Sequence, residues 1–387
     1  ETFADDTVGL SLSFSAQERN SAERFANVGG WNTSHASNFD QRLSVAQDNL
    51  EGDVNERQVN RPDCGTTIDS ESGEVRNKTF EEAYADGCMD TVSIPQSLAY
   101  NLSEYVSDRI NSQLTLQYRP LDSLTATIDY TYSKLDVERS YNDLSAWFNG
   151  QSTVSQSSVW DGQDDPIGSP LVYREVGENN DFAMGIGRDG STNTNNSLGL
   201  NLELFATDRL KLELDYHDSS AEYESNSPYG TSSLVTLASF NRTVSKAYFT
   251  EDLPILELGL NPADPRTVAE GGEPRPLYPN DMIITGSVFS NGHNKMNIEQ
   301  FRFKGTYDAS DILSVDFGLE MSEVSNRTRS SVVERGTWGG ISDPGYIADI
   351  LDLTSMEDNF DAVSGGNVQL RQVDSFYTTL DELAEKA

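Results

Sequence analysis

The sequence contains no long hydrophobic run. No stretch of about 18 apolar residues occurs in the 387-residue chain, so it encodes no transmembrane helix. Hydrophobic residues make up only 36% of the chain and the mean hydropathy is -0.53, which is low for a packed soluble core. With 16 Tyr and 16 Phe, the chain is nevertheless too rich in aromatic residues for a disordered protein. Part of the folded surface is therefore expected to be apolar, and much of the rest hydrated.

Basic residues are scarce. The chain has 27 Lys+Arg against 63 Asp+Glu, a net charge of -36, which repels a nucleic-acid backbone instead of neutralising it. We therefore expect no nucleic-acid partner. Acidic loops suit a hydrated surface and offer carboxylate oxygens for loop-bound Ca²⁺. No loop has the spaced Asp/Asn pattern with a terminal Glu that a Ca²⁺ loop needs, so we predict no cofactor.

Cysteine and histidine are also rare. Cys64 and Cys88 lie in one polar stretch, and two thiolates alone cannot complete a zinc site. In an oxidising compartment they are a candidate disulfide, and the alternative is a pair of free thiols. The three histidines, His35, His217 and His293, show no metal-ligand spacing. The sequence therefore predicts no metal site.

What the chain does contain is a repeated hairpin pattern. Similar segments run from Leu116 to Tyr132, from Ser197 to His217 and from Glu299 to Ser322. Each surrounds a five-residue turn with Asp at its third position, where the carboxylate is suited to accept a backbone N–H. A partial fourth copy lies at residues 3–14. The pattern predicts at least three antiparallel hairpins.

Each hairpin alternates apolar and polar residues with a period of two, as a half-exposed strand does. The intervening positions carry polar and charged side chains, with Phe205 as the large apolar exception. The predicted apolar face holds Leu114, Leu116, Tyr118, Leu124, Ala126, Ile128, Tyr130, Tyr132, Leu198, Leu200, Leu202, Leu204, Leu210, Leu212, Leu214, Tyr216, Phe301, Phe303, Gly305, Tyr307, Leu313, Val315, Phe317, Leu319 and Met321.

The connections separate two β architectures. Turns within hairpins use about four residues, whereas the segments between hairpins are long, at roughly residues 16–103, 135–196 and 219–297. A β-sandwich would have turns every ~8 to 12 residues, while an outer-membrane barrel alternates short turns with long loops. We therefore predict an all-β fold, a partial antiparallel transmembrane β-barrel with long extracellular loops. Within residues 232–249, a further strand pair is predicted around Asn241, Arg242 and Thr243.

The segment INSQLTLQYRPLDSLTATIDYTYSKLDVERSYNDLSAWF, residues 110–148, resembles the barrel of TonB-dependent outer-membrane receptors, especially the large Gram-negative group linked to carbohydrate uptake. Residues 200–222 and 281–307 are similar to later strands and loops of that barrel. The resemblance implies a 22-stranded barrel with an N-terminal plug domain. The chain departs from this pattern, since we find no plug, no TonB-box-like segment and no C-terminal aromatic strand. Residues 1–387 are therefore expected to be an internal fragment of the barrel domain.

The resemblance also implies a function, a location and partners. The parent protein would be a receptor in the Gram-negative cell outer membrane that binds an extracellular ligand for TonB-energised import. An oligosaccharide is the first candidate ligand and a siderophore, an iron chelate, the second. Further partners would be outer-membrane lipid and lipopolysaccharide, and the TonB complex through the missing plug.

Two groups of side chains are candidates for contact with a ligand. Loop aromatics, in Gly-rich polar surroundings, have rings that suit stacking on sugar faces, although packing between loops explains them equally well: Tyr141, Trp147, Phe148, Trp160 and Trp338. The polar strand face would line the lumen and contact water, plug or ligand: Gln113, Gln117, Thr125, Thr127, Asp129, Asn201, Glu203, Lys211, Glu213, Asp215, Arg302 and Lys304.

Other classes of protein are less consistent with these patterns. The main rival is a soluble, secreted β-rich carbohydrate-binding or adhesion module with its apolar face buried between two sheets. A secreted carbohydrate-active enzyme would need two carboxylates facing one cleft, and nothing selects a pair. Residues 185–190 match the dinucleotide pattern G-x-G-x-x-G, but a polar stretch follows, which favours a loop over the required helix. We therefore predict that the protein is not an enzyme.

Overall fold

The computed structural model describes residues 2–4, 7–35, 66–77, 79, 82, 91–148, 155–156, 159–160, 167–250, 253–260, 278–335, 343, 345–355 and 374–386. Within these residues the chain is all-β, with one α-helix and two short 3₁₀ turns. The prediction of an all-β antiparallel fold is confirmed. Among the described helices, none is long and apolar enough to cross a bilayer.

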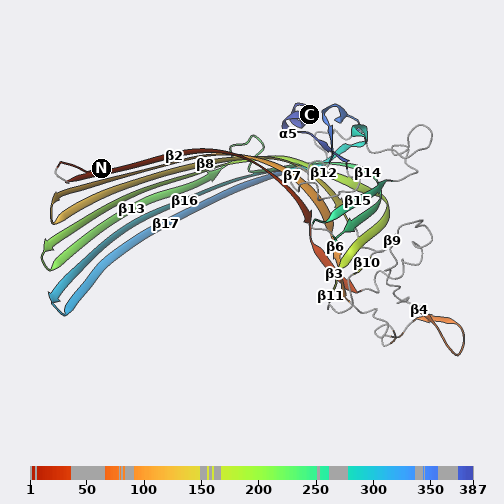
Figure 1. Cartoon of the computed structure of the whole chain (residues 1–387), viewed down its shortest axis with the longest axis horizontal. Helices are drawn as coiled ribbons and strands as arrows, with labels where there is room; N and C mark the ends of the chain where they lie inside the picture. Colours follow the sequence, from red (N-terminus) through yellow and green to blue (C-terminus); the bar gives the residue numbers. More distant parts are fainter. Residues whose placement is uncertain are drawn as a thin grey trace.

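Eight long strands form most of the structure, and they are accompanied by shorter elements (Figure 1). The long strands are β2 (Val8–Val28), β7 (Ser97–Leu121), β8 (Leu124–Trp147), β12 (Pro170–Thr207), β13 (Leu210–Glu224), β14 (Ser232–Tyr248), β16 (Ile283–Ser310) and β17 (Leu313–Arg335). The short elements are β1 (Thr2–Phe3), β3 (Trp31–His35), β4 (Thr66–Ile68), β5 (Val75–Asn77), β6 (Thr91–Pro95), β9 (Ser155–Gln156), β10 (Val159–Trp160), β11 (Ile167–Gly168), β15 (Ile255–Leu260), η2 (Pro279–Asp281), η3 (Ala348–Ile350), β18 (Asp352–Ser355), β19 (Asp374–Tyr377) and α5 (Leu380–Lys386).

The long strands form one sheet in which, apart from β14, each strand pairs with the next long strand of the chain. The order is β2, β7, β8, β12, β13, β16 and β17, and all these pairings are antiparallel. Strand β14 continues the path of β13, because it pairs with the first part of β12 and of β16, beyond the end of β13. The result is an up-and-down meander whose two edges are β2 and β17.

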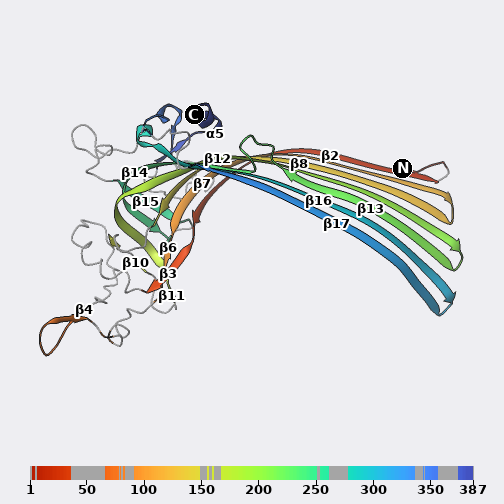
Figure 2. The same cartoon turned by 180° about the vertical axis from the view of Figure 1, so that it is seen from behind.

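Tight turns join β7 to β8, β12 to β13 and β16 to β17 at the same end of the sheet (Figures 1 and 2). The three predicted hairpins are therefore present. Their turns are closed differently from the prediction. Thr207 and Ser310 are the last residues of β12 and β16, and their hydroxyl oxygens accept the backbone N–H groups of Arg209 and Ile312. The Asp side chains at the turns take no such bond among the described residues.

The strands extend much further than the alternating pattern indicates. Residues 16–28, 97–103, 135–147, 170–196, 219–224 and 283–297 belong to the predicted loops, but they continue the strands of the sheet. At the far end of β7, β8 and β12, residues of both polarities are buried, among them Ser103, Asn142 and Glu175, so the polarity of a side chain there no longer follows the face it is on. The predicted strand pair around Arg242 is also wrong. β14 runs straight through it because the buried guanidinium donates to the carbonyl oxygens of Asp181 and Trp147 on neighbouring strands.

The G-x-G-x-x-G segment lies in the middle of strand β12, not in a loop. Its glycines make room for side chains from the next strands. A Cβ at Gly185 would meet the carboxylate of Asp143 at 2.5 Å, and one at Gly187 would meet the ring of Tyr141 at 2.3 Å. That ring crosses β12 so that its hydroxyl donates to the carbonyl oxygen of Ser233 at 2.6 Å. The motif therefore serves strand packing, which agrees with the absence of a following helix.

The hydrophobic core lies at the end of the sheet opposite the tight turns. Buried side chains of β7, β8, β12, β14 and β15 meet there, and Tyr100 fixes β15 by donating to the carbonyl oxygen of Pro254 and accepting the N–H of Leu256. Helix α5 buries Leu380 and Leu383 in the same core. The rest of the sheet is a single layer (Figure 2), and no described residue outside the sheet packs on its hairpin part.

Polar contacts hold α5 against the sheet. Arg188 of β12 forms ion pairs with Asp381 of the helix and with Glu138 of β8. The hydroxyl of Tyr229 donates to the other carboxylate oxygen of Asp381 at 2.7 Å. Burial and this hydrogen bond to a carboxylate raise the pKa of Tyr229 to about 12, so the contact persists through the whole physiological pH range.

Replacing Gly187 with Ala is expected to lower the free energy of unfolding by about 1–3 kcal/mol, because the new methyl group overlaps the ring of Tyr141. Gly199→Ala is the matched control on the same strand, since its Cβ has no neighbour nearer than 3.7 Å. Urea unfolding monitored by tryptophan fluorescence measures both. Equal stability of the two variants would contradict the packing role of Gly187.

Candidate functional site

The apolar side chains of the hairpins form one continuous band across the sheet. Residues opposite each other in an antiparallel pair share a face. One row of such partners runs Leu10, Leu116, Ile128, Leu200, Tyr216, Phe301 and Met321 from β2 to β17. The predicted apolar face is therefore a single face of a single sheet. We call the residues of the predicted apolar face, together with Val8, Leu10 and Leu12 of β2, the apolar band.

The apolar band is bare. Many of its large side chains are exposed, including Leu116 and Phe301 at 37%, Met321 at 63% and Leu12 at 72%, while others such as Leu212 and Phe303 are half-buried. The band crosses seven strands spaced at about 4.8 Å and covers roughly six to eight residues along each strand, so it measures about 30 Å by 20–27 Å. Such an area reaches or exceeds the largest apolar patch of ordinary soluble monomers. Something outside the described chain must cover it.

The opposite face of the hairpins is a ladder of polar bonds. Asn201 donates to Asp215 at 2.6 Å, and Arg302 donates to the same carboxylate at 2.9 Å. Lys211 bridges Glu203 at 3.1 Å and Glu213 at 2.6 Å. The structure thus places the predicted polar-face residues on one side of the sheet and brings several into contact. Also on this side are Gln113, Gln117, Thr125, Thr127, Asp129 and Lys304.

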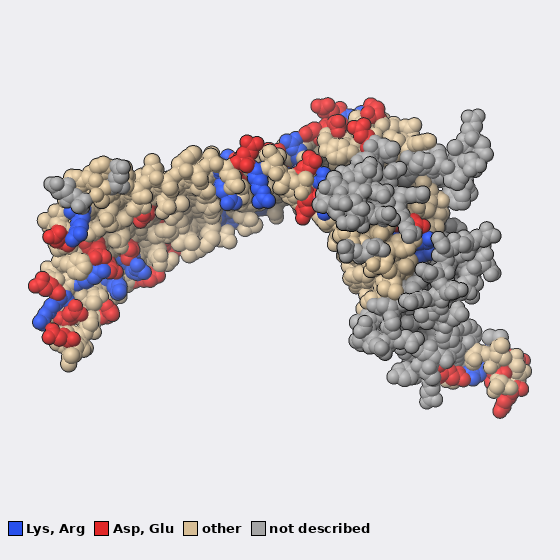
Figure 3. All heavy atoms as spheres, in the orientation of Figure 1, with Lys and Arg blue, Asp and Glu red and all other residues tan. Residues whose placement is uncertain are grey.

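A belt of charged side chains lies next to the apolar band on the same face, on the side away from the tight turns. It includes Lys134 and Asp136 on β8, Glu222 and Glu224 on β13, His293 and Lys295 on β16, and Arg327 and Arg329 on β17. In the view of Figure 3, charged side chains gather at the turn end and again near the middle of the sheet, with few between.

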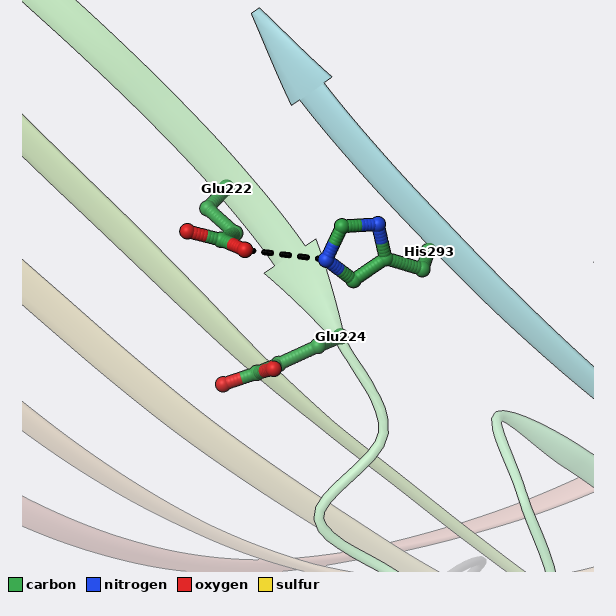
Figure 4. Close-up of side chains that lie close together, drawn as sticks. All are labelled: Glu222, Glu224 and His293. Atoms are coloured by element: carbon green, nitrogen blue, oxygen red, sulfur yellow. Dashed lines mark hydrogen bonds and ion pairs between the residues drawn. The ribbon is translucent and has the colours of Figure 1, made fainter. Parts of the chain in front are cut away.

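Within the belt, Glu222, Glu224 and His293 form a compact cluster (Figure 4). Glu222 and Glu224 alternate along β13 and so share a face, and His293 is brought beside them by the register of β16. One carboxylate oxygen from each Glu and a ring nitrogen of His293 lie within 4.8 Å of one another. Sequence reasoning missed this cluster, since 71 residues separate Glu222 from His293 and only the strand register joins them.

Hydrogen bonds orient the imidazole. Its Nε2 lies 2.9 Å from Glu222 Oε1, and Arg329 Nη2 lies 3.2 Å from its Nδ1 and 3.5 Å from its Nε2. Because a guanidinium only donates, a neutral ring that accepts from Arg329 at the nearer nitrogen, Nδ1, carries its proton on Nε2 and donates it to Glu222. Lys295 donates to the other oxygen of Glu222 at 3.2 Å. The ring of His293 is thus held with Nε2 facing the two carboxylates.

A cavity of about 390 Å³ adjoins the cluster. It opens beside the end of β13, where the chain leaves the sheet before β14 begins. Its lining residues, most of them polar or charged, come from β13, β16 and β17 and the residue after β13: Glu224, Ser225, Asn291, Gly292, His293, Arg329, Ser330 and Ser331. The cluster therefore faces a hydrated space large enough for several water molecules.

Most of the predicted loop aromatics that the structure describes lie in strands, and Phe148 is the residue that follows β8. Tyr141 and Trp147 belong to β8, and Trp160 to β10. The ring of Tyr141 is covered by the guanidinium of Arg139 at 4.2 Å. Phe148 is buried and packs edge-on against Tyr173 at 5.2 Å. Of these residues, Trp147, which is 57% exposed, keeps a ring available to a ligand.

Several predictions lie outside the described residues. Cys64 and Cys88, the candidate disulfide, are among them, and so is Trp338. Comparison of the chain with models of known families, with curated proteins and with solved structures gives no match. The resemblance to TonB-dependent receptors therefore stays a prediction based on the sequence patterns.

Alanine variants separate packing aromatics from available ones. Phe148→Ala is expected to lower the free energy of unfolding by about 3–5 kcal/mol, because it removes a buried ring from the core. Trp147→Ala, at the adjacent and exposed position, is expected to change it by less than about 1 kcal/mol. Denaturant unfolding of the two variants measures the difference. A Trp147→Ala loss as large as that of Phe148→Ala would assign Trp147 to the core instead.

Proposed function

We propose that this chain is part of the wall of an outer-membrane β-barrel, and that the whole protein is a receptor that imports a ligand. The observation that carries the proposal is the bare apolar band in register across seven strands. Its height of about 20–27 Å matches the apolar belt of about 25 Å on such barrels. Hydrocarbon is the covering that fits a continuous band whose members carry no charge.

Aromatic residues at the limits of the band support the proposal. Tyr118 and Tyr307 are exposed near the tight turns. At the other limit the hydroxyls of Tyr130 and Tyr216 donate to Asn196 and Glu299, each at 3.0 Å. Tyrosines with an apolar ring and a hydrated hydroxyl are typical of both interfaces of a bilayer. The charged belt would then lie at the level of the lipid and lipopolysaccharide head groups.

Strand direction supports a larger barrel. Six antiparallel steps separate β2 from β17, so both edge strands run in the same direction, away from the tight turns. The two edges of one chain therefore cannot pair with each other antiparallel. Closing the sheet into an all-antiparallel barrel requires further strands of the parent protein.

The transport role rests on the resemblance to TonB-dependent receptors. In this proposal the ligand is an oligosaccharide, with an iron chelate as second candidate, and import depends on a plug and the TonB complex. The polar face, with its Asp215, Arg302 and Lys211 ladder, would line the lumen. The second candidate function is a soluble secreted carbohydrate-binding or adhesion module, which the compact core at the other end of the sheet favours.

Adjacent residues of β7 test which medium covers each face. Leu116 belongs to the apolar band and Gln117 to the polar face. In the whole parent protein folded into phospholipid vesicles, Leu116→Arg is expected to cost about 2–4 kcal/mol, because the charge enters hydrocarbon. Gln117→Arg is expected to change stability by less than about 0.5 kcal/mol, because its side chain stays in water.

Unfolding by urea in vesicles measures both variants, with the unsubstituted parent protein as reference. The parent protein is expected to fold only when lipid or detergent is present. Cooperative folding in plain buffer, with Leu116→Arg destabilising there, would contradict the barrel and support the soluble module.

A further inference from the structure

We propose that Glu222, Glu224 and His293 form a binding site for a divalent transition-metal ion of the Zn²⁺ class. Two carboxylates and one imidazole are a ligand set that Zn²⁺ accepts, with a fourth position left for water or another ligand. The site stands on the strand register and side-chain geometry, independently of what covers the apolar band. It revises the sequence prediction that the chain holds no metal site.

The distances suit an ion. Ligand atoms around a tetrahedral Zn²⁺ lie about 3.4 Å apart, given metal–ligand bonds of about 2.0–2.2 Å. The three donor atoms are already within 4.8 Å of one another, and Glu222 Oε1 and His293 Nε2 are 2.9 Å apart. Binding therefore needs side-chain rotations that move the donor atoms by about 1 Å. The strands need not move, since β13 stays paired with β16 up to Tyr223 and Asn294, and β16 stays paired with β17 on both sides of His293.

Binding of the ion would change which ring nitrogen of His293 carries the proton. The ion would replace the Nε2 proton that His293 now donates to Glu222. The ring proton then resides on Nδ1, which can no longer accept from Arg329. Lys295 can remain on Oε2 of Glu222 and offset part of the negative charge. Arg329 is thus the group that competes with the ion.

The cavity supplies what an open coordination position needs. Glu224 and His293 belong to its wall, so the face of the ion away from the sheet would be directed into a polar space of about 390 Å³. Glu222 and His293 keep 35% and 21% of their side-chain surface exposed, so the ion can enter without opening the sheet. Water, or an oxygen of a larger ligand, would complete the tetrahedron.

Zn²⁺ titration of the folded chain in detergent, in competition with a chromophoric chelator, tests the proposal. We expect one ion per cluster, with affinity weakened about tenfold or more in Glu222→Gln and His293→Gln, since even changes beyond the direct ligands cost that much. His217→Gln is the matched control, because His217 lies on the other face of β13. Its affinity should equal that of the unsubstituted chain.

Arg329→Met gives a test with the opposite sign. Removing the guanidinium from beside Nδ1 is expected to strengthen Zn²⁺ binding by about threefold or more, because a competing donor and a nearby positive charge are lost. Co²⁺ bound to the unsubstituted chain should show the visible absorption of a tetrahedral site, and His293→Gln should abolish it. Absence of saturable binding, binding unchanged by His293→Gln, or weaker binding in Arg329→Met would overturn the proposal.

Discussion

The structure depends on the register between neighbouring long strands. Because successive side chains point to opposite faces, a slip of one residue in any pair would move an entire apolar row onto the polar face. The pairing of Leu116 with Ile128, and of Leu200 with Tyr216, prevents this by matching apolar partners row by row. On the other face, the bonds between Asn201, Asp215 and Arg302 reinforce the same register.

The two ends of the sheet differ in how their apolar side chains are buried. Near the tight turns, no described residue forms a second layer on the sheet, and many apolar side chains stay exposed. At the other end, the strands bury Leu98, Tyr100 and Leu144 against β15 and helix α5. Ion pairs such as Arg188 with Asp381 join these layers at the core's edge. The charged belt lies between the exposed hairpin part of the sheet and the end that contains the core. It includes the cluster of Glu222 and His293.

The hairpins could be predicted because only one of their faces is apolar, which leaves a period of two in the sequence. The strand extensions could not. Around Leu98 and Tyr100 the alternation is broken by residues whose burial depends on segments far away in the chain. The contact of His293 with Glu222 likewise requires the β13–β16 register, which no local pattern contains. The glycines at 185 and 187 resembled a nucleotide motif, whereas their role becomes clear only from the rings and carboxylates that cross them.

The most direct test of a lipid-facing apolar band uses neighbouring nitroxide labels. Leu202→Cys and Glu203→Cys would be labelled in the whole parent protein, with Cys64 and Cys88 replaced by Ser, after folding into phospholipid vesicles. The label at 202 should collide often with dissolved oxygen and rarely with a water-soluble nickel complex, and the label at 203 should show the reverse. Shielding of position 202 from both reagents would mean that protein covers the band, and would contradict the barrel wall.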